Sequence, residues 1–134
     1  GPLVERLSKA GVMVNVTAMM TLDQVREITE RLAPATPAII SVFAGRIADT
    51  GRDPVPLMAE AVKIMKAKPK AELIWASPRE LLNVVQADAI GCHIITVTKD
   101  ILAKLPMLGK DLGDLSLDTV KMFADDAAKA GYRL

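Results

Sequence analysis

The sequence predicts an α/β fold built on a parallel β-sheet, and three observations lead to this prediction. Runs of apolar and β-branched residues, typical of buried strands, begin near residues 12, 38, 72 and 92. Each run is followed by a segment whose apolar residues recur at helical spacing. The chain has 134 residues and is 51% hydrophobic, which is enough for one domain with a real core. Strands that alternate with helices favour parallel pairing through right-handed crossovers.

The first part of the chain holds an opening helix and two strands. The predicted elements are a helix over 3–10, a strand over 12–20, a helix over 21–33, a strand over 38–43 and a glycine-bearing loop over 44–54. The run over 12–20 is almost continuously apolar, which is typical of a strand covered on both faces. Thr21 stands where an N-cap is needed for the helix that follows.

The second part repeats the alternation. The predicted elements are a helix over 55–67, a strand over 72–77, a helix over 78–90, a strand over 92–97, a helix over 98–105, a turn over 106–114 and a helix over 116–131. Pro78 is predicted at the first helical position, where no amide donor is needed. Ser116 is predicted to cap the last helix, which is long enough to serve in subunit packing.

Four parallel strands are compatible with three architectures. The first is a small open sheet with helices on both faces, the second is half of an eight-stranded barrel, and the third is a piece of a larger open sheet. The pattern alone favours the small open sheet for a chain of this length. Four strands cannot close a barrel whose interior is filled by side chains from eight.

Composition excludes several classes of partner. The 17 basic and 16 acidic residues give a net charge of +1, and only four residues are aromatic, so a nucleic-acid partner is not expected. No apolar run approaches the roughly 18 residues that cross a bilayer, so no membrane partner is expected either. A single cysteine, Cys92, excludes an internal disulfide framework and favours the cytoplasm. We expect one domain over residues 1–134.

Polar residues at the predicted strand ends form the candidate site, because ligands of parallel α/β sheets bind at the carboxyl ends of the strands. These residues are Asn15, Thr17, Ser41, Arg46, Ser77, Arg79, Thr96 and Thr98. Asn15 stands out, since an amide buried in an apolar strand costs about a few kcal/mol unless it is hydrogen-bonded. Ser41 and Ser77 are each followed by an arginine, which predicts a phosphate cradle. The helix predicted to open at Ser77 would add its amides.

Each candidate also has an ordinary interpretation. A lone serine or threonine in a strand commonly bonds a backbone carbonyl or simply packs, and Arg46 or Arg79 taken singly can be a surface arginine. His93 follows Cys92, but no second pair of metal-ligating residues lies nearby in the sequence. We therefore interpret His93 as structural and expect no metal. The sequence has no GxGxxG, GxSxG or P-loop motif.

Five segments resemble, in the same order, segments of the transaldolase family. They are NVT at 15–17, ISVFAGRIADTGRDP at 40–54, WASPRE at 75–80, GCHIITVTKDILAKL at 91–105 and SLDTVKMFADDAAKAGY at 116–132. The combination of S-x-F-x-G-R-I with A-S-x-R is specific, whereas either motif alone is weak. The resemblance covers essentially the whole chain and is best to the short bacterial transaldolase-like proteins, which include fructose-6-phosphate aldolase relatives.

This resemblance implies a TIM (β/α)8 barrel, of which the four predicted units match strands five to eight. It also implies class I aldolase chemistry in carbohydrate metabolism of the pentose phosphate kind. A strand lysine forms a Schiff base with a ketose phosphate, and a dihydroxyacetone unit is released or passed to an aldehyde acceptor. No cofactor and no metal are expected.

The resemblance also implies roles for seven residues. Thr17 matches the threonine that helps position the catalytic water, and is therefore the predicted catalytic residue. The predicted substrate-binding residues are Asn15, Ser41, Phe43, Arg46, Ser77 and Arg79. Of these, Arg46, Ser77 and Arg79 match the residues that hold phosphate.

One departure from the family is large. The first four strands, which carry the Schiff-base lysine, have no counterpart here, and the ten lysines fall outside the four predicted strands. A surface lysine lacks the desolvated pocket that activates an amine. We therefore expect a transaldolase-like aldolase or transferase without the half that bears its nucleophile, inactive as it stands. The alternative is a non-catalytic half-barrel or small α/β phosphate-binding module that self-associates.

A half-barrel would leave two unpaired sheet edges, at 12–20 and 92–97, and an uncovered inner face. We expect this face to be covered by the missing amino-terminal half or by a second copy of the chain. The inner residues expected there are Val14, Val16, Ile40, Ile74 and Ile95. The other expected partner is a sugar phosphate or phosphate ion.

Overall fold

The computed structural model describes residues 1–132 and divides the chain into two compact units. The first unit is Gly1–Leu102 and the second begins at Ala103. The first unit contains the sheet and all the predicted site residues. The single domain predicted over residues 1–134 stays a prediction.

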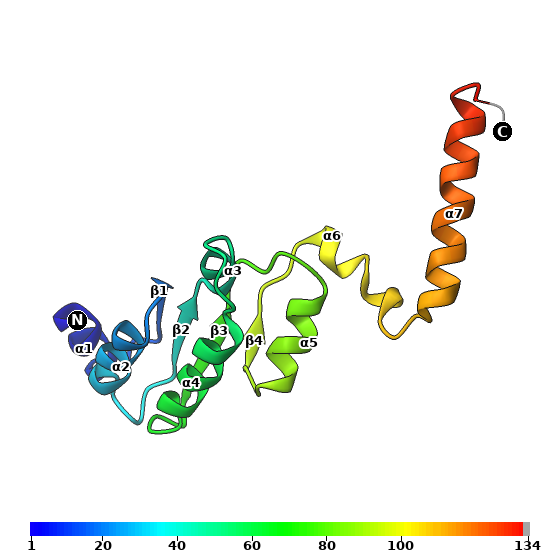
Figure 1. The fold of residues 1–134 in the computed structure, drawn as a ribbon. Coiled ribbons are helices and arrows are strands. Elements are labelled where there is room, and N and C mark those ends of the chain that lie inside the picture. Colours follow the sequence, from blue (N-terminus) through cyan, green and yellow to red (C-terminus); the bar gives the residue numbers. More distant parts are fainter. Residues whose placement is uncertain (133–134) are drawn as a thin grey trace. The chain divides into compact units, whose positions relative to one another are not determined.

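Helices and strands alternate along the first unit, as the sequence predicts (Figure 1). Its elements are α1 (Pro2–Lys9), β1 (Val14–Met19), α2 (Leu22–Arg31), β2 (Ala38–Val42), α3 (Ala44–Ala48), α4 (Val55–Met65), β3 (Ala71–Trp75), α5 (Leu82–Ala89), β4 (Ile94–Ile95) and α6 (Lys99–Leu102). Thr21 caps α2 as predicted, because its hydroxyl accepts from the Gln24 amide at 3.3 Å while the Gln24 side chain accepts from the Thr21 amide.

The four strands form one parallel sheet in the order β1-β2-β3-β4. This confirms the predicted α/β class with four parallel strands. Each strand pairs with its neighbour in the chain: Val14 pairs with Ala38, Ala38 with Ala71, and Ile74 with Ile94. No strand order reverses, so successive helical connections wind in one direction.

One face of the sheet forms the core with the helices. Ile40 and Leu73, which are register partners, are both 0% exposed and belong to the same buried cluster as Val25 of α2 and Met58 of α4. On the other face, Asn15, Ile39 and Glu72 form the neighbouring register row. Asn15 and Glu72 are exposed and Ile39 is half-buried in this row, whereas Ser41 and Ile74, the next row of the same face, are 4% and 8% exposed. We call this second face, which is exposed at its first row, the open face.

The open face corrects two expectations from the sequence. The run over 12–20 was predicted to be covered on both faces, but only one face of β1 joins the core. Four of the five expected inner residues, Val14, Val16, Ile40 and Ile95, pack with the helix-side cluster, and only Ile74 lies on the open face. A run of apolar residues without alternation does not reveal which residues face which side of the sheet, so the predicted assignment of residues to the inner face was wrong.

The bounds of several helices also differ from those predicted, and three of the differences bear on the site or on helix capping. Residues 44–48, predicted as loop, form the short helix α3. Helix α5 begins at Leu82 and not at Pro78, because the Asn83 side chain bonds the preceding amides. The last helix, α7 (Leu112–Lys129), begins four residues early because Asp111, not Ser116, caps it by accepting from the Gly113 and Asp114 amides at 2.8 and 3.0 Å.

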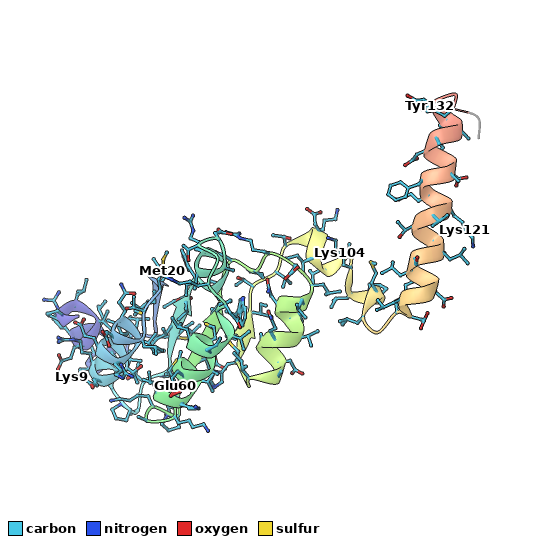
Figure 2. The ribbon with its side chains drawn as sticks, in the orientation of Figure 1. Lys9, Met20, Glu60, Lys104, Lys121 and Tyr132 are labelled. Atoms are coloured by element: carbon cyan, nitrogen blue, oxygen red, sulfur yellow. The ribbon has the colours of Figure 1, made fainter. Side chains whose placement is uncertain are left out.

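The second unit contains a 3-10 turn, η1 (Leu105–Met107), and the 18-residue helix α7. Figure 2 labels Lys121 and Tyr132 in this part of the chain. None of the α7 side chains is buried, and apolar side chains such as Phe123 and Val120 are 63% and 60% exposed. Within residues 1–132, no helix is both long and apolar enough to cross a membrane.

Candidate functional site

Backbone hydrogen bonds bring the carboxyl ends of β1, β2 and β3 together. The Phe43 amide donates to the Met19 carbonyl at 2.9 Å, and the Ala76 amide donates to the Val42 carbonyl at 2.8 Å. Met20, labelled in Figure 2, directly follows β1 at this edge. The segments that follow the strands therefore start side by side, where ligands of parallel sheets bind.

Asn15 and Ser41 meet on the open face. The Ser41 hydroxyl donates to Oδ1 of Asn15 at 2.8 Å, and Ser41 is only 4% exposed. This bond fixes the orientation of the Asn15 amide. The Nδ2 group of Asn15 has no hydrogen-bond partner among the residues that the structure describes, so it is free to donate to a ligand on the open face.

Thr17 lies at an irregularity of β1. Val16 pairs with Ile40 but Met19 pairs with Val42, so β1 contains one residue more than β2 over this stretch. Ala18 takes up the extra length with a left-handed φ of 63°. The bulge returns Met19 to the core, where it is 5% exposed, and leaves Thr17 exposed beside it.

Gly45 and Ser77 lock the second and third strand ends together. The Gly45 amide donates to the Ala76 carbonyl at 3.2 Å. A Cβ added at Gly45 would lie 1.4 Å from the Ser77 carbonyl oxygen, so only glycine fits. Ser77 itself has a left-handed φ of 58°, a strained conformation for a serine that this contact helps to hold. The lock sets Ser77 against Gly45, the residue that precedes Arg46.

The two predicted phosphate-binding arginines are held in different ways. Arg46 lies on α3 with its guanidinium carbon 6.0 Å from the centre of the Phe43 ring, at the outer limit of a cation–π contact. Arg79 donates from Nε to Oδ1 of Asp49 at 2.9 Å and from Nη2 to Oδ2 at 2.5 Å. Arg79 and, through space, Arg46 hold the pKa of the Asp49 carboxyl below its ordinary value.

Asp49 was not identified from the sequence. It lies in the segment predicted as loop, and its partner Arg79 is far away along the chain, so no local pattern points to the pair. Gly45 and Asn83 were missed for the same reason. The Gly45 requirement comes from a contact with another segment, and Asn83 lies within a segment that reads as an ordinary helix.

The predicted contribution of a helix N-terminus after Ser77 is wrong. The Arg79 and Glu80 amides donate to Oδ1 of Asn83 at 2.7 and 3.2 Å, and α5 begins only at Leu82. These two amides are therefore not available to a ligand. They supply the hydrogen bonds that the buried Asn83 side chain, which is 8% exposed, requires. A phosphate cradle at this edge would therefore depend on side chains and not on helix amides.

A hollow of about 420 Å³ lies at the opposite, amino-terminal end of the strands, and includes Lys66, Lys68 and His93 in its lining. Two of these groups are already engaged: Lys68 Nζ donates to the Leu32 carbonyl at 2.5 Å, and Nδ1 of His93 accepts from the Leu73 amide at 3.0 Å. The ends of α4 and α5 that border it present carbonyl groups, which disfavour an anion. His93 has the structural role that we predicted.

Comparisons with known proteins agree with the resemblance seen in the sequence. The family model described as Transaldolase/Fructose-6-phosphate aldolase matches residues 1–134. A probable transaldolase from Thermoanaerobacter sp. is 33% identical over 132 residues, which is 98% of this chain and 57% of that protein. One from Methanococcus vannielii is 32% identical over 123 residues, which is 91% of this chain and 54% of that protein.

A third probable transaldolase, from Nitrosopumilus maritimus, is 33% identical over 101 residues, which is 74% of this chain and 44% of that protein. The chain thus spans about half the length of the curated relatives that it matches.

Proposed function

We propose, because the chain belongs to the transaldolase and fructose-6-phosphate aldolase family, that it forms the phosphate-binding half of a sugar-phosphate site. The complete site would carry out class I aldolase or transaldolase chemistry. A lysine from the other half would form a Schiff base with a ketose phosphate, and a dihydroxyacetone unit would be released or transferred. The lone thiol of Cys92 is in keeping with a reducing cytoplasm.

The order of the strands supports a half-barrel that matches strands five to eight of a TIM barrel. In a small open sheet with helices on both faces, the strand order reverses at least once. Here the order is β1-β2-β3-β4 without reversal, and the open face carries Asn15 and Ser41 in hydrogen-bonding contact. In a closed barrel this face would become the interior, covered by a partner with four more strands.

The observation that carries the proposal is the arrangement of Arg46, Ser77 and Arg79 at one edge of the sheet. The lock between Gly45 and Ser77 brings the two arginine-bearing segments together. Two guanidinium groups and a hydroxyl are suited to bind the oxygens of a phosphate monoester. Phosphate held there would direct the sugar along the open face, towards Asn15, Ser41 and Phe43.

Thr17 would complete the reaction in the assembled barrel. Its hydroxyl is exposed on β1, at the bulge, and is a suitable donor and acceptor for a water molecule. We propose that it orients the water that gives and takes protons during formation and hydrolysis of the Schiff base. The bulge supports this role, because it leaves Thr17 exposed where a water molecule can reach its hydroxyl.

Binding of inorganic phosphate to the purified chain tests the proposal. By isothermal titration calorimetry, Arg46→Ala should lose most of the affinity, since a hydrogen bond to a charged group contributes about 1.5–3 kcal/mol. The matched control is Arg6→Ala, an exposed arginine on α1 whose side chain has no partner among residues 1–132. Unchanged binding in Arg46→Ala would refute the site.

One observation favours a second function, a phosphate-binding module without turnover. In the part of the chain that the structure describes, no lysine lies in β1, β2, β3 or β4. We therefore expect no Schiff base in this chain alone. Borohydride reduction with dihydroxyacetone or fructose 6-phosphate, followed by mass spectrometry, decides the question: a stoichiometric adduct on any lysine would show that the chain is itself catalytic.

A further inference from the structure

Arg79 and Asp49 form a two-point contact although both side chains are exposed to solvent. Both Asp49 oxygens are used, at 2.9 and 2.5 Å, and the two side chains remain 47% and 52% exposed. An ion pair this exposed contributes little to the free energy of folding. A two-point contact nevertheless fixes the plane of a guanidinium group, which a single contact does not do.

The contact leaves the rest of the guanidinium available. Arg79 has five N–H groups, and the Nε–H and one Nη2–H are directed at Asp49. Three N–H groups remain, and none has another hydrogen-bond partner among the described residues. The Asp49 carboxylate thus engages one side of the fork and leaves the other side to a ligand.

The positive charges of both Arg79 and Arg46 favour the ionised form of the Asp49 carboxyl. Asp49 follows α3, which carries Arg46, and the positive charge of Arg46 helps to keep its carboxyl ionised. The lock between Gly45 and Ser77 holds the two segments that bear Asp49 and Arg79 next to one another. One carboxylate against two guanidinium groups leaves one net positive charge for an incoming anion.

We propose that Asp49 is a positioning residue for phosphate binding, which orients the Arg79 guanidinium for the phosphate group of the substrate. This inference rests on the proposed function, since it assumes that Arg79 binds phosphate. Without Asp49, the ligand itself would have to order the guanidinium group. The side-chain entropy lost on binding would then weaken the affinity for phosphate. Asp49 supports the site without contacting the substrate.

The test compares Asp49→Asn with the unmodified chain. The substitution keeps the size of the side chain and removes its charge, so the fold and the melting temperature should not change. Calorimetric titration with inorganic phosphate should give an affinity about ten-fold weaker. The NMR signal of the Arg79 Nε–H should be sharp and protected from exchange in the unmodified chain, and it should broaden or vanish in Asp49→Asn. Asp49→Glu, which keeps the charge, should restore part of both.

Two further variants separate positioning from a general effect of charge. Asp23→Asn removes the carboxylate of another exposed arginine pair, with Arg26 at 3.1 Å on α2, and should leave phosphate affinity unchanged. In an Arg79→Lys background the two-point contact is absent, so adding Asp49→Asn should have little further effect on affinity.

Each contrary outcome has a distinct meaning. Tighter phosphate binding by Asp49→Asn would show that Asp49 competes with the ligand and would overturn the inference. Unchanged affinity or an unchanged Nε–H signal would overturn it too, while the proposed function stands. If the unmodified chain itself binds no phosphate, the proposed function is refuted and a phosphate-positioning role for Asp49 is refuted with it.

Discussion

The two faces of the sheet are made by alternate residues of the same strands, yet they differ in what they do. On the helix side, Ile40 and Leu73 are fully buried and hold α2 and α4 to the sheet. On the open face, Asn15 and Glu72 are exposed, and Ser41 is used in a hydrogen bond to Asn15. The main hydrophobic cluster lies on the helix side, and the open face carries polar groups that can serve in binding.

Neighbouring residues of β3 give the sharpest test of this comparison, with the largest expected effect. Leu73→Ala, on the buried face, should cost about 2–5 kcal/mol in the free energy of unfolding, measured with urea. Glu72→Ala, one residue away on the open face, should change it by no more than about 0.5 kcal/mol. Equal losses would show that the open face is also part of the stabilising core.

Gly45→Ala should be next in size, because its Cβ would overlap the Ser77 carbonyl. We expect a loss of about 1–3 kcal/mol in unfolding free energy together with weaker phosphate binding, as Ser77 is displaced. Gly51→Ala is the control: its Cβ meets no atom within 4 Å but its φ is +77°, so we expect a loss of about 1–2 kcal/mol. Phosphate affinity in Gly51→Ala should not change, and a parallel loss there would contradict the lock.

A charge on the open face should change association rather than stability. Ile39 is half-buried on this face, and a half-barrel without its partner should associate through it. Ile39→Glu should shift the chain towards the monomer in size-exclusion chromatography with light scattering. Val85→Glu, on an exposed position of α5, should leave the mass unchanged. If the unmodified chain is a monodisperse monomer that unfolds cooperatively, the half-barrel is wrong and the open sheet is favoured.

The smallest effect concerns Cys92, which packs against the helix-side core. Burial raises the pKa of its thiol. The neutral thiol is favoured in the folded chain, so the resulting stability is complete below the ordinary thiol pKa and is lost as the pH rises through the raised value. Alkylation by iodoacetamide at pH 8 should therefore be slower in the folded chain than in urea. Equal rates would place Cys92 outside the core.

The succession of strands and helices was predictable because each element carries its own local pattern. Apolar runs marked the four strands, and Thr21 marked the start of α2. The parts that failed depend on contacts between distant segments. Helix α3 is held through Gly45 against Ser77, and the start of α5 is set by Asn83, so a local pattern could not reveal either. The parity of β1 failed because its run has no alternation.

The location of the candidate site was predictable from the sequence, but the residues that orient its side chains were not. Residues at strand ends were easy to collect, since the edge of a parallel sheet is where they must converge. The bond between Ser41 and Asn15 has another origin: Asn15 is the second residue of β1, in register with Ile39, and the bond joins two side chains on the same face of adjacent strands. The residue that orients Arg79 was not found, because Asp49 and Arg79 come from separate βα connections and no spacing rule relates them.

The unreversed strand order has a consequence for how the chain is made. Every strand pairs with the strand that precedes it in the sequence, from Val14 with Ala38 to Ile74 with Ile94. A growing chain that leaves the ribosome can therefore add each βα unit to an edge that already exists, without waiting for a later strand to be inserted between two earlier ones. Folding can keep pace with synthesis, because each of β2, β3 and β4 finds its pairing edge already formed.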